Sequence, residues 1–277
     1  MVQTGRKNRE ITDSYLVDTH CHLDMDAYAG DLDGVVAEAS SHGVRRIITV
    51  GIDEKSSSRA VSLARRFREV WATVGIHPHN SGELDETSLA VLKELALDPT
   101  GKVVGYGEIG LDYAKKYAPP DLQRDCFSRQ LSLAGELGLP VIIHDRDAHA
   151  DTLAILREHA PFTTGGVMHC FSGDPGLAWQ VIELGLHISI PGIVTFRNSA
   201  TLQEVAREIP LDRMLLETDG PFLSPEPKRG RVNRPAYLVY TAKKIAELRG
   251  IELGELARRT SANAAGLFRL PALENPA

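Results

Sequence analysis

Six residues with metal-binding side chains each close an apolar run of this chain. His20 and His22 end the first run, and later runs end at Glu108, His144, His169 and Asp219. Residues two apart in a strand point to the same side, so the first two imidazoles can converge on one ion at about 2.0–2.1 Å. Histidines and carboxylates in this number predict a hydrolase that binds two divalent ions and uses them to activate water.

Eight short apolar runs alternate with segments of helical periodicity, which is the pattern of repeated βα units. The predicted strands are residues 15–20, 44–51, 70–76, 103–108, 141–144, 166–169, 187–190 and 214–218. Predicted helices between them include residues 32–42, 57–67, 88–97, 121–137 and 175–184. Two terminal helices, residues 235–249 and 253–268, follow the eighth strand.

The distribution of the candidate ligands favours a closed sheet. They follow strands one, four, five, six and eight, whereas an open doubly wound sheet gathers its ligands near one switch point. Ligands so widely spaced meet only if the first and last strands become neighbours. We therefore expect residues 15–270 to form one (β/α)8 TIM barrel, which includes an additional C-terminal helix. A flexible N-terminal arm at residues 1–14 and a tail at residues 271–277 would flank it.

Composition and charge narrow the class of protein. No apolar stretch approaches the roughly 20 residues of a membrane span, and the first 14 residues lack the apolar centre of a secretory signal. Three cysteines form neither an even disulfide set nor a Cys-x-x-Cys pair, so we expect a cytoplasmic protein in which Cys21 and Cys170 are buried packing residues turned away from the barrel mouth. The net charge of −6 argues against indiscriminate coating of nucleic acid but allows a local positive site. No membrane partner and no obligate protein partner is indicated.

Five further motifs surround the candidate ligands. They are GIHPH at residues 75–79, GEIGLDY at 107–113, IHDRDA at 143–148, MHCFSG at 168–173 and ETDGPF at 217–222. With the opening histidine pair, this set resembles the TatD family of metal-dependent deoxyribonucleases from about residue 18 to residue 268. The resemblance implies a TIM barrel of the amidohydrolase type. One departure is Asn233-Arg234-Pro235, where the family usually has Asn-Glu-Pro, and it concerns local substrate contacts rather than the metal centre.

The resemblance also implies a role for each candidate ligand. The first ion would be held by His20, His22 and Asp219, the second by His144 and His169, and Glu108 would bridge the two. An imidazole-rich set suits zinc, manganese, iron or nickel, and cellular availability could load magnesium instead. Two divalent ions and two carboxylates leave a charge of about +2, which attracts an anionic phosphodiester.

Catalytic roles are expected for three residues. Asp219 can orient the attacking water and accept its proton, and Glu108 holds both ions. The resemblance makes His77 a catalytic or phosphate-contacting residue outside the metal shell. For His79, behind a proline turn, we expect a structural role with hydrogen bonds to backbone, whereas Asp112 is left open between supporting the mouth and packing.

Basic residues gather where a barrel binds phosphate. Candidate substrate contacts, besides His77, are Arg146, Arg197, Arg229 and Arg231, with Lys228 and Arg234 nearby. No stacking ladder of aromatic residues is evident. Tyr113 and Phe171 nevertheless lie close enough in sequence to the site to contact a terminal base. For Tyr113, as for Asp112, support of the mouth and packing also remain open.

These features predict a cytoplasmic deoxyribonuclease in which a metal-activated hydroxide cleaves phosphodiester bonds, with exonuclease action on single-stranded DNA or strand ends. Two alternatives remain. One is an amide or ester hydrolase such as a D-aminoacyl-tRNA deacylase, because the same hydroxide can attack a carbonyl. The other is a catalytically silent, metal-stabilised binding protein.

Overall fold

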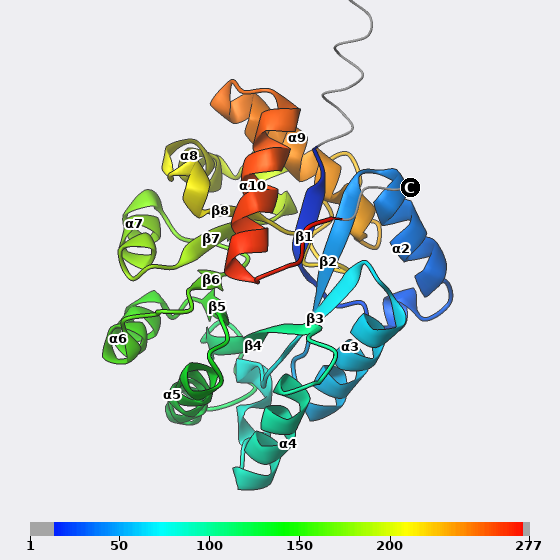
Figure 1. Ribbon diagram of the computed structural model, residues 1–277. Helices are drawn as coiled ribbons and strands as arrows, with labels where there is room; N and C mark the ends of the chain where they lie inside the picture. The colour runs from blue at the N-terminus through cyan, green and yellow to red at the C-terminus, as the bar shows by residue number, and fades with distance from the viewer. Residues whose placement is uncertain (1–13, 274–277) are drawn as a thin grey trace, which may run out of the picture.

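Eight parallel strands form a barrel in the computed structural model, which describes residues 14–273 (Figure 1). Their order is the order of the chain, and the strands are β1 (Leu16–Cys21), β2 (Val44–Val50), β3 (Val70–Val74), β4 (Val103–Asp112), β5 (Val141–Arg146), β6 (Gly166–Met168), β7 (His187–Ile190) and β8 (Met214–Leu216). The predicted TIM barrel is confirmed. Of the predicted arm and tail, all but Ser14 and residues 271–273 lie outside the described residues.

The sheet closes between its first and last strands. A parallel bridge joins Cys21 to Gly220, the amide of His22 donates to the carbonyl of Gly220 at 2.8 Å, and the amide of Asp219 donates to the carbonyl of His20 at 2.9 Å. The buried carboxylate of Asp18 adds two bonds at the same seam, from the amide of Thr218 at 2.9 Å and from its hydroxyl at 2.5 Å. Closure therefore brings the ends of β1 and β8 together, as the candidate ligands require.

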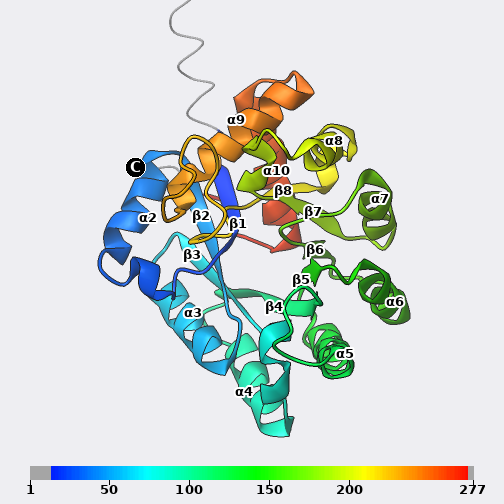
Figure 2. The same ribbon diagram turned by 180° about the vertical axis from the view of Figure 1, so that it is seen from behind.

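Helices surround the barrel (Figures 1 and 2). They are α2 (Leu32–Ser41), α3 (Glu54–Arg66), α4 (Glu86–Ala96), α5 (Pro120–Leu137), α6 (His149–His159), α7 (Pro175–Glu183), α8 (Ala200–Glu208), α9 (Leu238–Arg249) and α10 (Leu253–Leu267). Four of them begin at an aspartate whose side chain accepts a first-turn amide, a strong helix start; these are Asp31, Asp53, Asp85 and Asp174. Among the described residues, no helix is both long and apolar enough to cross a membrane.

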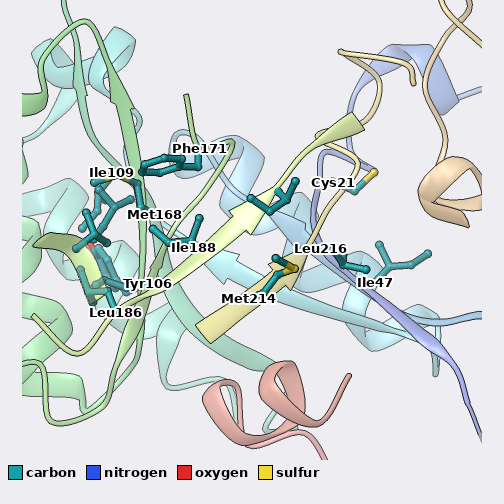
Figure 3. Close-up of a cluster of buried hydrophobic side chains, with 14 of the residues drawn as sticks. Cys21, Ile47, Tyr106, Ile109, Met168, Phe171, Leu186, Ile188, Met214 and Leu216 are labelled. Carbon is teal, nitrogen blue, oxygen red and sulfur yellow. The ribbon is translucent and has the colours of Figure 1, made fainter. Parts of the chain in front are cut away.

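Neighbouring residues of one strand pack into two different apolar clusters, because side chains alternate between the faces of a sheet. One cluster lies between barrel and helices and includes Ile143. Figure 3 shows part of this cluster, with Ile47 and Met168 among its labelled residues. The other contains Ile48, Ile142, Val167 and further strand residues, together with Leu267 and Phe268. The helix α10 lies at the end where the strands begin, since Ser261 donates to the carbonyl of Tyr15 and Asn263 to that of Met214. The opposite end, where the strands finish, remains for the site.

A buried side-chain amide fastens α5 to the GIHPH motif, at its second residue, Ile76, just after β3 ends. The side-chain oxygen of Gln130 accepts the amide of Ile76 at 2.8 Å, and its side-chain nitrogen donates to the carbonyl of Ile76 at 2.9 Å. Gln130 is fully buried. The backbone that leads to His77 therefore depends on this side chain.

Replacing Gln130 should destabilise the barrel. Gln130→Ala leaves a buried donor and acceptor without partners, which should lower the free energy of unfolding by about 2–4 kcal/mol in urea denaturation. Gln180→Ala, at an exposed position on α7, should change it by less than about 0.5 kcal/mol. Equal, small effects of both substitutions would contradict the role given to Gln130.

Candidate metal centre

The six candidate ligands converge at the carboxyl ends of the strands. His20, Glu108 and His144 lie in β1, β4 and β5, and His22, His169 and Asp219 follow β1, β6 and β8. Five of them are at most 9% exposed, and His144 is half-buried. Residues from five strands thus bring their polar atoms into one small buried region, which packing alone does not require.

One group of donor atoms surrounds a single point. The Nε2 atoms of His20 and His22 lie 3.3 Å apart. Glu108 Oε2 lies 3.3 and 3.7 Å from these two nitrogens, and Asp219 Oδ1 lies 3.8 and 3.5 Å from them. Neighbouring ligands of a tetrahedral ion at about 2.0–2.1 Å are about 3.3 Å apart. Two nitrogens and two carboxylate oxygens at this spacing fit one divalent ion.

A second group shares Glu108 with the first. Its Oε1 atom lies 2.7 Å from His144 Nδ1 and 2.7 Å from His169 Nε2, and these two nitrogens are 3.2 Å apart. The two oxygens of one carboxylate thus face different histidine pairs. This arrangement fits a carboxylate that bridges two ions.

The outer nitrogens of three histidines point toward oxygen atoms, and that of His22 is within hydrogen-bond distance of its acceptor, which holds the inner lone pair of this ring toward the site. His22 Nδ1 lies 3.1 Å from the carbonyl of Val50, His144 Nε2 lies 3.4 Å from Asp112 Oδ2, and His169 Nδ1 lies 3.6 Å from Glu217 Oε1. A metal ligand needs that unprotonated inner nitrogen. The surroundings of these histidines therefore also fit bound ions.

Both carboxylates are ionised in this environment. Burial alone would raise the pKa of Glu108, but the imidazoles of His169, His77 and His20 outweigh burial and hold that pKa well below its ordinary value. Burial is likewise outweighed at Asp219, whose pKa is lowered by its hydrogen bond to His22 and by the charge of His20. Two buried negative charges among histidines are an electrostatic match for cations.

His77 differs from the six candidate ligands in the nitrogen that it presents. Its Nδ1 accepts the backbone amide of His79 at 3.1 Å, so the proton of the neutral ring sits on Nε2. Burial is the main cause that lowers the pKa of His77, to about 4, so the ring is neutral at pH 7. Although Nε2 lies 3.4 Å from Glu108 Oε1, within a cluster of possible ligands with His144, it is a hydrogen-bond donor in this tautomer.

Two acids in contact with the histidines were not assigned to the site from the sequence. Glu217 is fully buried, accepts the amide of Cys170 at 2.6 Å and faces His169. Asp112, left open between two roles, contacts both His144 and His79, with its Oδ2 atom 2.8 Å from His79 Nε2. The side chain of His79 therefore contacts a carboxylate instead of the expected backbone partner, and its structural role stays a prediction. An acid within an apolar strand end was the only signal for Glu217.

Phe171 and Tyr113 were the two residues expected to be able to contact a terminal base, and for Phe171 this expectation was wrong. Its ring is 2% exposed and belongs to the buried cluster of Figure 3. Tyr113 is half-buried and donates its hydroxyl to Asp151 at 2.6 Å. Cys21 is buried as expected, but Cys170 is only partly so.

Of the predicted basic residues, Arg146 is the last residue of β5, and the others follow β7 and β8 at the same end of the barrel. Arg146, Arg197, Arg229 and Arg231 are all exposed. The guanidinium of Arg229 lies 4.6 Å above the centre of the Phe196 ring, and Arg234 is paired with Glu38 at 2.9 Å. The first four side chains are open to solvent, and Arg229 also lies 3.9 Å from Glu226, whereas Arg234 is engaged with α2.

Comparison with known proteins gives one consistent family. The model of the family described as TatD related DNase matches residues 17–269. The chain is 42% identical to an uncharacterized metal-dependent hydrolase, YabD, of Bacillus subtilis, over 92% of this chain and 99% of the relative. It is 40% identical to the 3'-5' ssDNA/RNA exonuclease TatD of Erwinia billingiae, over 93% of this chain and 100% of the relative. The crystal structure of YjjV, a TatD homologue from Escherichia coli, superposes with a TM-score of 0.88 at 31% identity, over 92% of this chain and 98% of that one.

The shared carboxylate should govern metal binding. Glu108→Gln keeps the shape of the side chain but removes its charge and one ligand oxygen, so affinity for Zn²⁺ should fall at least about tenfold. Equilibrium dialysis with elemental analysis measures this, with two ions per chain expected for the wild type. Glu158→Gln, an exposed position on α6, is the matched control. Two ions bound with unchanged affinity by Glu108→Gln would exclude a bridging role.

Proposed function

Because this chain belongs to the family of TatD-related deoxyribonucleases and is a metal-dependent hydrolase, we propose that it is a 3'-5' exonuclease of single-stranded DNA. Glu108 carries the proposal, since its two oxygens face two separate groups of histidines. The relative of Erwinia billingiae, named an exonuclease of single-stranded DNA and RNA, supports the choice of substrate.

The residues around Glu108 suit two divalent ions. One would be held by His20, His22 and Asp219, the other by His144 and His169, with Glu108 shared. When bound, such ions lower the pKa of water and neutralise charge that develops on phosphoryl oxygens. Imidazole-rich ligands favour zinc, manganese, iron or nickel, and magnesium is the alternative that availability could supply.

Two side chains have proton-transfer and positioning roles in this proposal. Asp219 has the more exposed of the two carboxylates, 13% against 4% for the side chain of Glu108. It can therefore orient a water from the open side and accept its proton. His77 presents a protonated Nε2 to the same region and can donate to a phosphoryl oxygen of the substrate.

The exposed arginines support an anionic polymer as the substrate. Arg229 and Arg231 lie in one loop after β8, Arg146 ends β5, and Arg197 follows β7. Cationic side chains on several loops around one mouth can track a phosphate backbone without reading sequence. A compact ester would make no use of them.

Side-by-side assays on single-stranded DNA, D-aminoacyl-tRNA and a small ester should separate the three candidate functions, and removal of the proposed base should test the role of Asp219. The wild type should release nucleotides from the 3' end of single-stranded DNA, and a chelator should stop the release. Asp219→Asn should lower kcat by about 10²–10⁴-fold because an amide cannot accept the proton. Hydrolysis of D-aminoacyl-tRNA or of a small ester, but not of DNA, would contradict the proposal. Metal-dependent DNA binding without turnover would indicate a silent binding protein.

Charge reversal should reveal the path of the strand. In Arg229→Glu with Arg231→Glu, the plot of log Kd against log salt for a labelled oligonucleotide should flatten by at least about 1.4. Each phosphate contact to a single strand contributes about 0.7 to that slope. The same reversals at the exposed Arg157 and Arg207, on α6 and α8, serve as the control. An unchanged slope in the first variant would remove its loop from the binding surface.

A further inference from the structure

Two aromatic rings are exposed beside the metal centre. Phe222 is 49% exposed, and its ring centre lies 6.2 Å from that of His22 in an edge-to-face contact. Tyr117 is 69% exposed, and its ring centre lies 4.6 Å from that of His79. His79 in turn packs on His77, whose Nε2 reaches Glu108. Each exposed ring is therefore connected to the shared carboxylate through histidines, Phe222 through His22 and Tyr117 through His79 and His77.

The two rings stand on different sides of the mouth. Tyr117 lies in the loop after β4, and Phe222 lies in the loop after β8. In a closed sheet whose strands run in the order of the chain, β4 and β8 are half a turn apart. Glu108 and the histidines that it contacts lie between these loops. A ligand phosphate at the metal centre would therefore have one aromatic ring on either side.

The backbone holds Phe222 at the surface. Its amide donates to the carbonyl of Asp219 at 2.9 Å, and its carbonyl accepts from Asn233 Nδ2 at 2.6 Å. The next residue, Leu223, has a left-handed φ of 55° although it is not glycine, and it is 36% exposed. Backbone strain and exposure of apolar side chains both cost free energy, and because these side chains stay exposed, no burial compensates that cost. Such features gather at ligand sites.

We infer that Phe222 and Tyr117 stack on the two nucleobases that flank the cleaved phosphodiester. This inference rests on the proposed exonuclease function and extends it to the recognition of bases. Every nucleobase offers an aromatic face, so such stacking tolerates any sequence. Nucleobases suit these rings better than an apolar protein surface does, because the loop of Phe222 also carries the exposed cations Arg229 and Arg231, which match the adjoining phosphates.

Abasic substrates separate contacts with bases from contacts with the backbone. The substrates are a single-stranded oligothymidylate, the same strand without its terminal base, and the same strand without its penultimate base. Phe222→Ala and Tyr117→Ala should each raise KM for the intact strand about tenfold or more. Each effect should vanish on one of the two abasic strands, and the two variants should differ in which strand that is.

Three further variants make the result specific. Trp179→Ala removes an exposed aromatic ring of α7, 43% exposed, and should leave KM unchanged on all three strands. Phe222→Trp and Tyr117→Phe keep an aromatic face and should retain wild-type KM. Circular dichroism should show that all variants are folded, because both rings are exposed.

Three outcomes would overturn the inference. An unchanged KM in both alanine variants would mean that the rings do not contact the substrate. A rise in KM that persists equally on both abasic strands would mean that the rings contact the nucleic-acid backbone or another partner, and not the bases. If the wild type neither binds nor cleaves any of the three strands, the proposed exonuclease function itself fails, and the stacking role fails with it.

Discussion

The rest of this site depends on the contacts that the carboxylate of Glu108 makes with the surrounding histidines. Its two oxygens face two different histidine pairs at 2.7–3.7 Å, and its side chain is almost fully buried. A buried charge is costly unless opposite charge or hydrogen bonds compensate it. Imidazoles do so here, and two cations would do so more strongly. The closed barrel brings the other candidate ligands from distant strands to this one group.

Closure of the barrel makes that meeting possible. The seam between β1 and β8 joins His20 to Asp219 and His22 to Gly220 through backbone hydrogen bonds. The ligands of the first proposed ion are thereby neighbours although they come from opposite ends of the chain. Asp18 and Thr218 secure the same seam with side-chain bonds. Metal binding and closure of the sheet are thus two consequences of one arrangement.

Much of the fold and the convergence of the six candidate ligands could be predicted from the sequence, because strand periodicity is local and parallel strands end on one side of a sheet. Seven strands begin at the predicted residue. Prediction failed where the backbone leaves the regular strand. Cys170, expected to be buried, has a left-handed φ angle of 45° and is only partly buried, because strand alternation no longer tells which way its side chain points. The contact of Glu217 with His169 and that of His79 with Asp112 join separate strands and loops, and no local pattern encodes them.

Anomalous diffraction from crystals of the protein grown with Zn²⁺ or Mn²⁺ would show whether Glu108 is shared by two ions. Two peaks are expected, one on either side of the Glu108 carboxylate. One should lie among His20, His22 and Asp219, and the other beside His144 and His169. A single peak, or peaks that do not contact Glu108, would exclude a shared carboxylate.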